Sequence, residues 1–236
     1  MPLTDGGKKY AIVIGINDYP GEANDLQYSV ADAKSVDDVL LSKYGFSAEN
    51  IQLLTNSECT RTAVYNAVNA LKPQLTPQDE LVFFYSGHGA KGKAADGDSS
   101  NNDQSIVVWN GTTDADGFAF IWDGELKALF NDFPTNRIVF IFDSCASGGM
   151  SVLAKSGRIV NMACSASGYS YESSTWGGGH GQFTYYFAIQ GMLYANADTK
   201  LKDERVTVEE AFDYAKRYCT LQKPVIADGF SNDLLM

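Results

Sequence analysis

Two short segments of the chain carry residue types that can perform nucleophilic chemistry. RIVFIFDSCASGG contains Cys145, and DELVFFYSGHGA contains His88. Each is an apolar run, rich in residues that favour strands, that stops at small residues. A thiol needs a nearby base to become a thiolate nucleophile, and imidazole is the usual partner. If the two strands end side by side, both groups meet at one sheet edge, an arrangement suited to a Cys–His hydrolase.

Each of these residues could also have a purely structural role. A lone cysteine in an apolar run is usually a small core residue. Cys145 instead follows its strand, where the chain must leave the sheet. His88 stands between two glycines, which permit close approach of a ligand to the backbone. The other histidine, His180, lies in GGGHGQF with no strand to deliver it, so we expect a loop residue there, with lining of the site as the alternative.

Strand and helix patterns alternate along the chain, which predicts a mostly parallel sheet with helices on both faces. Strand patterns occupy residues 10–16, 51–55, 81–86, 137–142, 158–165 and 224–228. Helix patterns occupy residues 29–44, 60–71, 123–131, 183–194 and 206–221. SIVVW and FAFIW form a predicted hairpin, and loops are expected at 91–103 and 166–182. Sites in such sheets gather at the carboxyl ends of the strands, where His88 and Cys145 both fall.

Length and composition predict one globular domain over residues 1–236. Apolar residues make up 44% of the chain and charged residues 20%, and the formal net charge is −11. That charge argues against nucleic acid or an anionic membrane as a partner and is compatible with a basic substrate. No apolar run approaches a membrane span, and the first residues lack the core of a signal peptide. The four cysteines show no metal-ligand spacing, so we expect reduced thiols and a cytoplasmic location.

The paired motifs resemble those of the caspase-like cysteine peptidases, and above all the metacaspases and their prokaryotic relatives, the orthocaspases. The carrying features are a strand followed by SGHG and a later strand followed by DSCxSG, at a spacing close to the roughly 50 residues quoted for caspases. YAIVIGINDY and QYSVADAKSV also look like metacaspase segments. The resemblance runs from Tyr10 to about Asp228. It implies a caspase-like fold with a six-stranded, mostly parallel sheet flanked by helices.

The resemblance implies an endopeptidase in which Cys145 attacks the scissile carbonyl and His88 moves the proton. It also implies that backbone N–H groups of Gly89 and Cys145 hold the oxyanion. The chain departs from the caspases proper, which carry QAC at the nucleophile. It also has Ala146 where metacaspases usually have a second histidine. That position lies outside the dyad, so the departure bears on closeness to the eukaryotic metacaspases more than on activity.

Metacaspases accept Arg or Lys through acidic pocket residues, whereas caspases accept aspartate through basic ones. The matching positions are Asp32 and Asp143, with Ser29 and Ser86 beside them. Asp143 directly follows a strand, so it should be partly buried, and a buried carboxylate is costly unless it is paired. One interpretation is an internal aspartate that shapes the loop. The favoured interpretation is a pocket floor for a guanidinium.

Two further features follow from the resemblance. Many metacaspases depend on calcium, and Asp96, Asp98 and Asp103 lie in an acidic stretch of the kind that calcium prefers. The alternative is a solvated acidic loop, because no EF-hand pattern is present. Lys155 and Arg158 follow Cys145, where a peptidase cutting after basic residues could cut itself.

Three functions remain in competition. The first is an endopeptidase that cuts protein or peptide substrates after Arg or Lys. The second is a caspase-fold peptidase with aspartate or another specificity. The third is a catalytically silent interaction module of the same fold, against which the intact Cys–His pair argues. We expect a monomer, with no nucleic-acid or membrane partner, and calcium as the one candidate cofactor.

Overall fold

A six-stranded sheet forms the centre of the fold. The computed structural model describes residues 1–4, 6–97, 102–111, 117–200 and 202–236. Strand order is β11-β8-β7-β3-β1-β2, and neighbours are parallel except for the antiparallel pair β11 and β8. The strands are β1 (Lys9–Gly15), β2 (Ile51–Thr55), β3 (Glu80–Ser86), β7 (Ile138–Asp143), β8 (Arg158–Met162) and β11 (Val225–Asp228). The prediction of a mostly parallel six-stranded sheet is confirmed.

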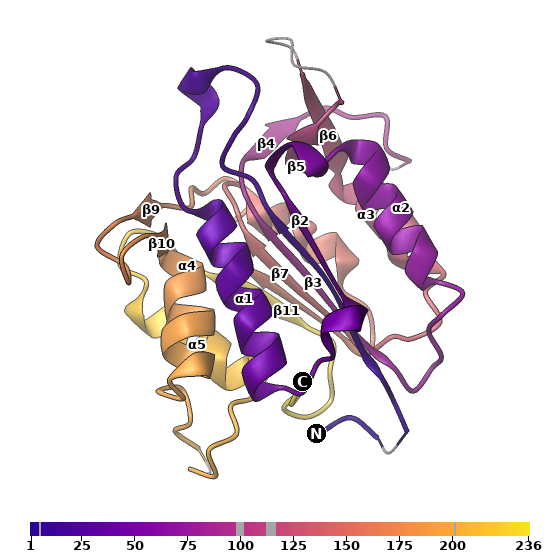
Figure 1. The fold of residues 1–236 in the computed structure, drawn as a ribbon, viewed down its shortest axis with the longest axis vertical. Helices are drawn as coiled ribbons and strands as arrows, with labels where there is room; N and C mark the ends of the chain where they lie inside the picture. The colour runs from indigo at the N-terminus through magenta and orange to yellow at the C-terminus, as the bar shows by residue number, and fades with distance from the viewer. Residues whose placement is uncertain (5, 98–101, 112–116, 201) are drawn as a thin grey trace.

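Helices cover both faces of this sheet (Figure 1). Helices α2 and α3 pack on one face, and α1, η5 and α5 pack on the other. The longer helices are α1 (Ser29–Lys43), α2 (Arg61–Leu71), α3 (Asp123–Asn131), the π-helical η5 (Tyr185–Leu193) and α5 (Val208–Tyr218), and the short α4 (Gln182–Thr184) leads into η5. Short 3₁₀ segments are η1 (Glu22–Asn24), η2 (Ala48–Asn50), η3 (Asn56–Glu58) and η4 (Ser147–Leu153). Among the described residues, no helix is both long enough and apolar enough to cross a bilayer.

The central strands form because their side chains find an apolar layer on either side. In β1, Ile12 and Ile14 join the core beneath α2 and α3, whereas Ala11 and Val13 join the core beneath α1. All four are fully buried. Successive strand residues point to opposite faces, and full burial of such a side chain contributes roughly 1.5–3 kcal/mol. A strand with both faces buried reads as a continuous apolar run, which is why β1 was visible in the sequence.

Close packing of α1 on the end of β1 depends on Gly15. A Cβ atom at Gly15 would lie 2.5 Å from the Ser29 carbonyl oxygen and 2.6 Å from the Ala33 Cβ atom. The missing side chain therefore lets the first turn of α1 rest directly on the strand. This contact carries Ser29 and Asp32 to the carboxyl edge of the sheet.

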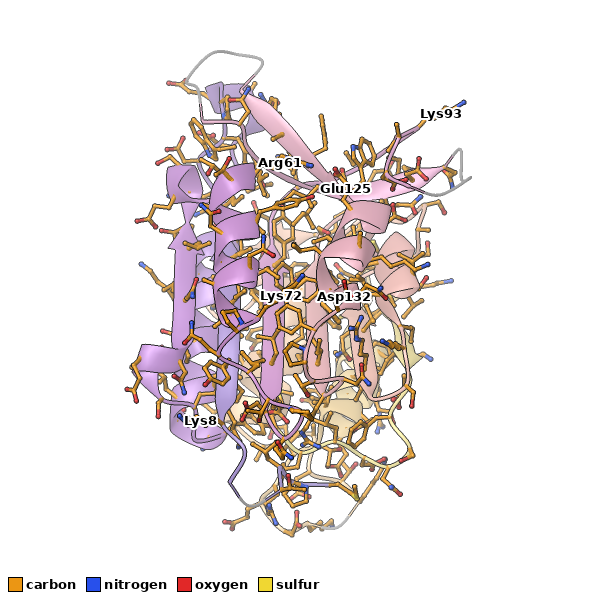
Figure 2. All side chains as sticks on the ribbon, turned by 90° about the vertical axis from the view of Figure 1, so that its right-hand side faces the viewer. Lys8, Arg61, Lys72, Lys93, Glu125 and Asp132 are labelled. Carbon is orange, nitrogen blue, oxygen red and sulfur yellow. The ribbon has the colours of Figure 1, made fainter. Side chains whose placement is uncertain are left out.

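The two helices on the first face of the sheet, α2 and α3, are joined by the ion pair between Arg61 and Glu125, which lie next to each other in Figure 2. The two guanidinium–carboxylate contacts measure 2.5 and 3.0 Å. Glu125 also accepts a hydrogen bond from the Trp122 backbone N–H at the start of α3. Thr60 caps the start of α2, since its hydroxyl accepts the Ala63 N–H at 3.0 Å.

Two smaller sheets lie beyond the carboxyl ends of the central strands. One combines β4 (Gly89–Gly92), β5 (Asp103–Trp109) and β6 (Phe118–Trp122), and it contains the predicted hairpin. The other is the short hairpin of β9 (Glu172–Ser173) and β10 (His180–Gly181). Parts of the expected loops at 91–103 and 166–182 are therefore strands. Their polar, glycine-rich sequences pair through backbone hydrogen bonds, which leave no hydrophobic pattern.

Candidate active site

A small cavity of about 50 Å³ opens at the carboxyl ends of β3 and β7. Its lining comes from the residues at and after the ends of these two strands, from the first turn of α1 and from the β9–β10 hairpin. The predicted side chains brought together there are Ser29, Asp32, Ser86, His88, Asp143 and Cys145. Residues from four distant parts of the sequence thus share one cavity.

His88 follows β3 and is held on its backbone and its ring. Its N–H donates to the Tyr19 hydroxyl at 2.9 Å, and its carbonyl accepts from the Tyr85 hydroxyl at 2.7 Å. The ring packs on Tyr19 with a centroid distance of 4.7 Å. Its Nε2 lies 2.7 Å from the Asn24 carbonyl oxygen. Because a carbonyl can only accept, Nε2 carries the proton, and the basic nitrogen of the neutral ring is Nδ1.

Cys145 lies in the turn after β7, ahead of Ala146, whose φ of 58° is left-handed. Its thiol donates to the Ser170 carbonyl at 3.7 Å, and the Ser170 N–H points at the sulfur at 3.4 Å. Burial raises the pKa of the Cys145 thiol, and the negative charge of Asp143 adds to that effect. The resting sulfur is therefore a neutral thiol that needs a base to become a nucleophile.

Gly89 lies directly against the nucleophile. A Cβ atom there would come within 1.9 Å of the Cys145 carbonyl oxygen, so only glycine fits. The Val107 N–H donates to the His88 carbonyl at 3.1 Å, which makes the next pair, Gly89 and Ile106, a non-hydrogen-bonded pair. The Gly89 N–H is thus directed away from β5. Both predicted oxyanion donors, Gly89 and Cys145, lie at the same edge.

Asp32 occupies the first turn of α1 and is 1% exposed. One carboxylate oxygen accepts from the Ser86 hydroxyl at 2.9 Å, and the other contacts His180 Nδ1 at 3.0 Å. The Gly181 N–H lies 3.1 and 3.2 Å from the two oxygens. Burial raises the pKa of Asp32 to about 7, against the opposing effect of the His180 and Ser86 hydrogen bonds. The carboxyl group is therefore close to its titration point at neutral pH.

Asp143 ends β7 and faces Asp32 across Gly181. A Cβ atom at Gly181 would lie 2.4 Å from Asp143 Oδ2 and 2.9 Å from Asp32 Oδ2. Asp143 accepts from the Ser170 hydroxyl at 2.5 Å and from the Thr184 N–H and hydroxyl at 2.9 and 2.7 Å. Burial raises the pKa of Asp143, and these hydrogen bonds lower it. The carboxylate thus does shape the loop, as one interpretation held, while it also lines the cavity.

Several functional contacts were absent from the sequence-based prediction. The Asn24 carbonyl that orients His88 is a backbone group and has no signature in the side chains. Ser170 and Thr184 are common residue types in a polar stretch. The loop assignment of His180 is wrong, because His180 begins β10, pairs with Ser173 of β9 and contacts Asp32. The paucity of histidines in the chain was the one available signal for it.

The predicted acidic residues form a cluster with a different membership. Asp96, Asp103 and Asp123 place carboxylate oxygens within 4.8 Å of one another, while Asp98 lies outside the described residues. Asp103 is fully buried, and within the described part of the chain each of the three has one buried oxygen without a hydrogen-bond partner. Burial and the neighbouring carboxylates raise the pKa of Asp123 to about 6. Three hard oxygen donors of this kind fit calcium.

The two basic residues considered for self-cleavage lie at the opposite end of the sheet from the cavity. Lys155 is exposed in the turn before β8. Arg158 begins β8, is 2% exposed, and donates from its guanidinium to the Phe130 carbonyl at 2.6 Å. Arg158 is therefore inaccessible in the folded chain, and cleavage at Lys155 requires a second molecule.

Comparison with known proteins gives one family. Residues 9–154 match the family described as "Metacaspase, peptidase C14 domain". The chain is 31% identical over 150 residues to Metacaspase-1 of Ajellomyces capsulatus, covering 60% of this chain and 41% of that protein. It is 33% identical over 152 residues to Metacaspase-1 of Schizosaccharomyces pombe, covering 61% and 35%. The matched part thus spans about two-fifths of these relatives or less.

A solved structure extends the likeness to the whole chain. The crystal structure of a Geobacter sulfurreducens protein superposes with a TM-score of 0.70 at 18% identity, covering 96% of this chain and 95% of that one. At this identity the likeness concerns the fold alone. It includes the elements after residue 154, which lie beyond the family match.

Proposed function

This chain belongs to the metacaspase family of C14 peptidases, and we propose that it is a cysteine endopeptidase that cleaves after Arg or Lys. The observation that supports this specificity is the pair of buried carboxylates, Asp32 and Asp143, which flank Gly181 in the cavity next to Cys145. A guanidinium or ammonium group supplies both the positive charge and the N–H donors that such a pair can bind. An aspartate side chain would instead meet two like charges.

In the proposed mechanism, His88 Nδ1 takes the proton of the Cys145 thiol as the sulfur attacks the scissile carbonyl. The Asn24 carbonyl supports this step, because it fixes the protonated nitrogen at Nε2 and can stabilise the imidazolium that forms. The imidazolium then protonates the leaving amine. A water molecule, deprotonated by the same ring, attacks the thioester and releases the acid product.

The backbone N–H groups of Gly89 and Cys145 hold the negative charge that develops on the carbonyl oxygen. Their support is the close approach of Gly89 to Cys145, which only a glycine allows. Oxyanion donors are typically worth ~10²–10³ in rate where they can be deleted. Backbone donors on a strand and a tight turn are already in place, so they need no reorganisation during the reaction.

The β9–β10 hairpin forms one wall of this cavity, while Asp143 and Cys145 lie on β7 and the turn after it. Besides its two residue pairs, the hairpin is held by Glu172, whose carboxylate accepts the Gln27 and Tyr28 backbone N–H groups at 2.8 and 2.9 Å, and by the Gly181 N–H contact with Asp32. The substrate side chain would therefore enter between an anchored hairpin and the ends of β3 and β7.

The experiment uses fluorogenic peptides that end in Arg, Lys or Asp. The proposal expects cleavage after Arg and Lys, with loss of more than a hundredfold in kcat/KM for Asp143→Ala and for Asp32→Ala. A buried charge that loses its partner typically costs ~3–5 kcal/mol. Asp37→Ala, on the same helix, is the matched control, and circular dichroism checks the folding of each variant.

Each competing function gives a different result in this assay. Cleavage after Asp would support the second candidate. A purified, folded chain that cleaves none of the peptides, with or without calcium, would favour the silent interaction module. Full Arg activity in both carboxylate variants would remove these residues from the pocket.

A further inference from the structure

His180 contacts the specificity carboxylate from outside the catalytic cavity. Its Nδ1 lies 3.0 Å from Asp32 Oδ1, and its side chain is 12% exposed against 1% for Asp32. The ring lines a second cavity, of about 290 Å³, that it shares with Tyr185 and Asp38. Asp32 lines the catalytic cavity. The pair therefore links the two cavities, and the ring can exchange protons with solvent through its own side.

Among the described residues, His180 is the only titratable side chain that forms a hydrogen bond with Asp32. Ser86 and Gly181 both donate hydrogen bonds to its oxygens. Burial works against ionisation of Asp32, whereas the His180 contact favours it. An imidazole that donates from Nδ1 therefore supports a carboxylate that burial would otherwise neutralise.

The groups around this pair are acidic or neutral. Asp143 faces Asp32 across Gly181, and Glu172 lies opposite Gly181 in the β9–β10 pairing. On the other side are Asp38 and the Tyr185 ring, which stacks on His180 at a centroid distance of 6.4 Å. The described residues that line the two cavities include no Lys or Arg. Uptake of one proton by the pair is thus the available way to cancel the charge of Asp32.

We propose that His180 is a positioning residue of the specificity pocket, which favours the ionised form of Asp32 and cancels its charge when the ring takes up a second proton. This inference rests on the proposed cleavage after Arg or Lys. Imidazole is the side chain that ordinarily changes charge between pH 5 and 8. On acidification, KM for basic substrates should therefore rise. This rise is separate from any effect of pH on the Cys145–His88 chemistry.

The test measures kcat and KM for an arginine peptide from about pH 5 to about pH 8.5, the range in which imidazole titrates. In the wild type, KM rises below the titration of the pair and approaches tenfold per pH unit. His180→Leu cannot donate to Asp32, so the rise starts at higher pH, and KM near pH 7 is about tenfold larger. His180→Gln keeps a donor but cannot take a second proton, so it restores KM near pH 7, and the rise that remains on acidification reports the protonation of Asp32 alone.

Two further measurements isolate binding from chemistry. The dissociation constant of an uncleaved arginine peptide for Cys145→Ala should follow the same pH profile and shift in the same way with each His180 variant. Ser173→Ala, which lies opposite His180 in the hairpin, is the control and should leave the profile unchanged. Circular dichroism and thermal melting confirm that the hairpin variants are folded.

The outcomes separate the two proposals. Absence of cleavage after Arg or Lys at every pH overturns the proposed function. Cleavage after Arg with one common KM–pH profile for the wild type, His180→Leu and His180→Gln overturns the role of His180 alone. A change confined to kcat would also overturn it, because that result would place His180 in the chemistry and not in the pocket.

Discussion

At Cys145, burial and hydrogen bonding act on the thiol in opposite directions. Burial and the nearby Asp143 raise its pKa, while the Ser170 N–H lowers it. Because the net effect on the pKa is upward, the sulfur rests as the neutral thiol at pH 7. A base must therefore act within the same encounter as the substrate. His88, whose proton is fixed on Nε2 by Asn24, is the described group suited to that task.

Replacement of Cys145 tests this assignment. We expect Cys145→Ala to abolish peptidase activity with an unchanged fold, because alanine fills the place of a thiol at little packing cost. His88→Ala should give nearly the same loss. Cys164→Ala is the matched control, since Cys164 is a buried thiol that contacts the Ser144 carbonyl and the Ser147 hydroxyl. Wild-type turnover by Cys145→Ala, measured with the arginine peptide, would assign the nucleophile to another group.

Asp32 should also cost the folded chain stability. Its pKa of about 7 lies above the ordinary value of 3.8, so folding favours the protonated form. This contribution is fully present below about pH 4, is lost as pH rises toward 7, and is absent above it. Above pH 7, we expect the free energy of unfolding of Asp32→Asn to exceed that of the wild type by roughly 1.4 kcal/mol for each unit of the pKa shift.

The control for this comparison is Asp38→Asn, an exposed change on the same helix. Chemical denaturation at several pH values measures the free energy of unfolding of all three proteins. A stability difference between Asp32→Asn and the wild type that does not grow with pH would show that the carboxyl group is not strained by burial. Activity toward arginine peptides should fall in the same variant, so stability and function move in opposite directions.

From the sequence, the main side chains of the candidate site could be predicted, but most of their hydrogen-bond partners could not. Cys145, His88 and Asp143 could be found because strand patterns and short motifs place them at strand ends, whereas Asp32, on a helix, was assigned from the resemblance to metacaspases. Asn24 could not be found, since its contribution is a carbonyl oxygen. His180 was misassigned because its strand is two residues long and pairs through the backbone, so no alternation of apolar residues marks it.

At the scale of elements, the acidic cluster connects three segments that the chain delivers separately. Asp96 follows β4, Asp103 begins β5, and Asp123 begins α3. The Asp103 carboxylate accepts the Ala94 N–H, and the Asp96 carboxylate accepts the Gly124 N–H at 3.1 Å. The remaining oxygens repel one another, which an ion would relieve. The strand β4 begins directly after His88, so one short strand separates the proposed base from Asp96.

We expect millimolar calcium to bind this cluster and to raise the thermal midpoint of unfolding by several degrees. The reason is that an ion bound to the folded state alone stabilises it by mass action. Calorimetry measures the binding, and Asp123→Asn should weaken it at least tenfold. Asp132→Asn, a surface change at the end of the same helix (Figure 2), is the control. No heat of binding, with activity unchanged in chelator, would leave a solvated acidic cluster.

Predicted elements match the structure where an apolar pattern had enough length. The strands β1, β2, β3, β7 and β11 and the helices α1, α2 and α3 lie within two residues of their predicted bounds. The segment at 183–194 was predicted as one helix, but most of it is π-helical. Its wider turn is closed by tertiary packing against α1 and α5, which the local sequence does not encode. The same holds for β4 and the β9–β10 hairpin.

At the scale of the whole molecule, the chain carries a net charge of −11, and the candidate pocket is itself lined by carboxylates. A charge of this size raises the local concentration of cationic substrates and repels anionic ones. The effect is long-range and therefore sensitive to salt. The Debye length falls from about 30 Å at 0.01 M to about 8 Å at 0.15 M ionic strength.

We expect kcat/KM for a peptide with several basic residues to fall several-fold between these two salt concentrations. A peptide with the same scissile arginine but acidic flanking residues is the control and should show the opposite trend. Initial rates at low substrate concentration measure both. If the two peptides respond to salt alike, the overall charge has no part in substrate capture.

If the peptidase cuts itself, the buried position of Arg158 makes the site of cleavage depend on whether the molecule is folded. A bond after Arg158 can be reached only in a molecule that has lost its β8 contacts, because the guanidinium is enclosed and bonded to Phe130. A bond after Lys155 is open in intact molecules and needs only an encounter between two of them. In a stored preparation, fragments ending at Lys155 should therefore increase with protein concentration. Fragments ending at Arg158 should increase with temperature, as unfolded molecules accumulate.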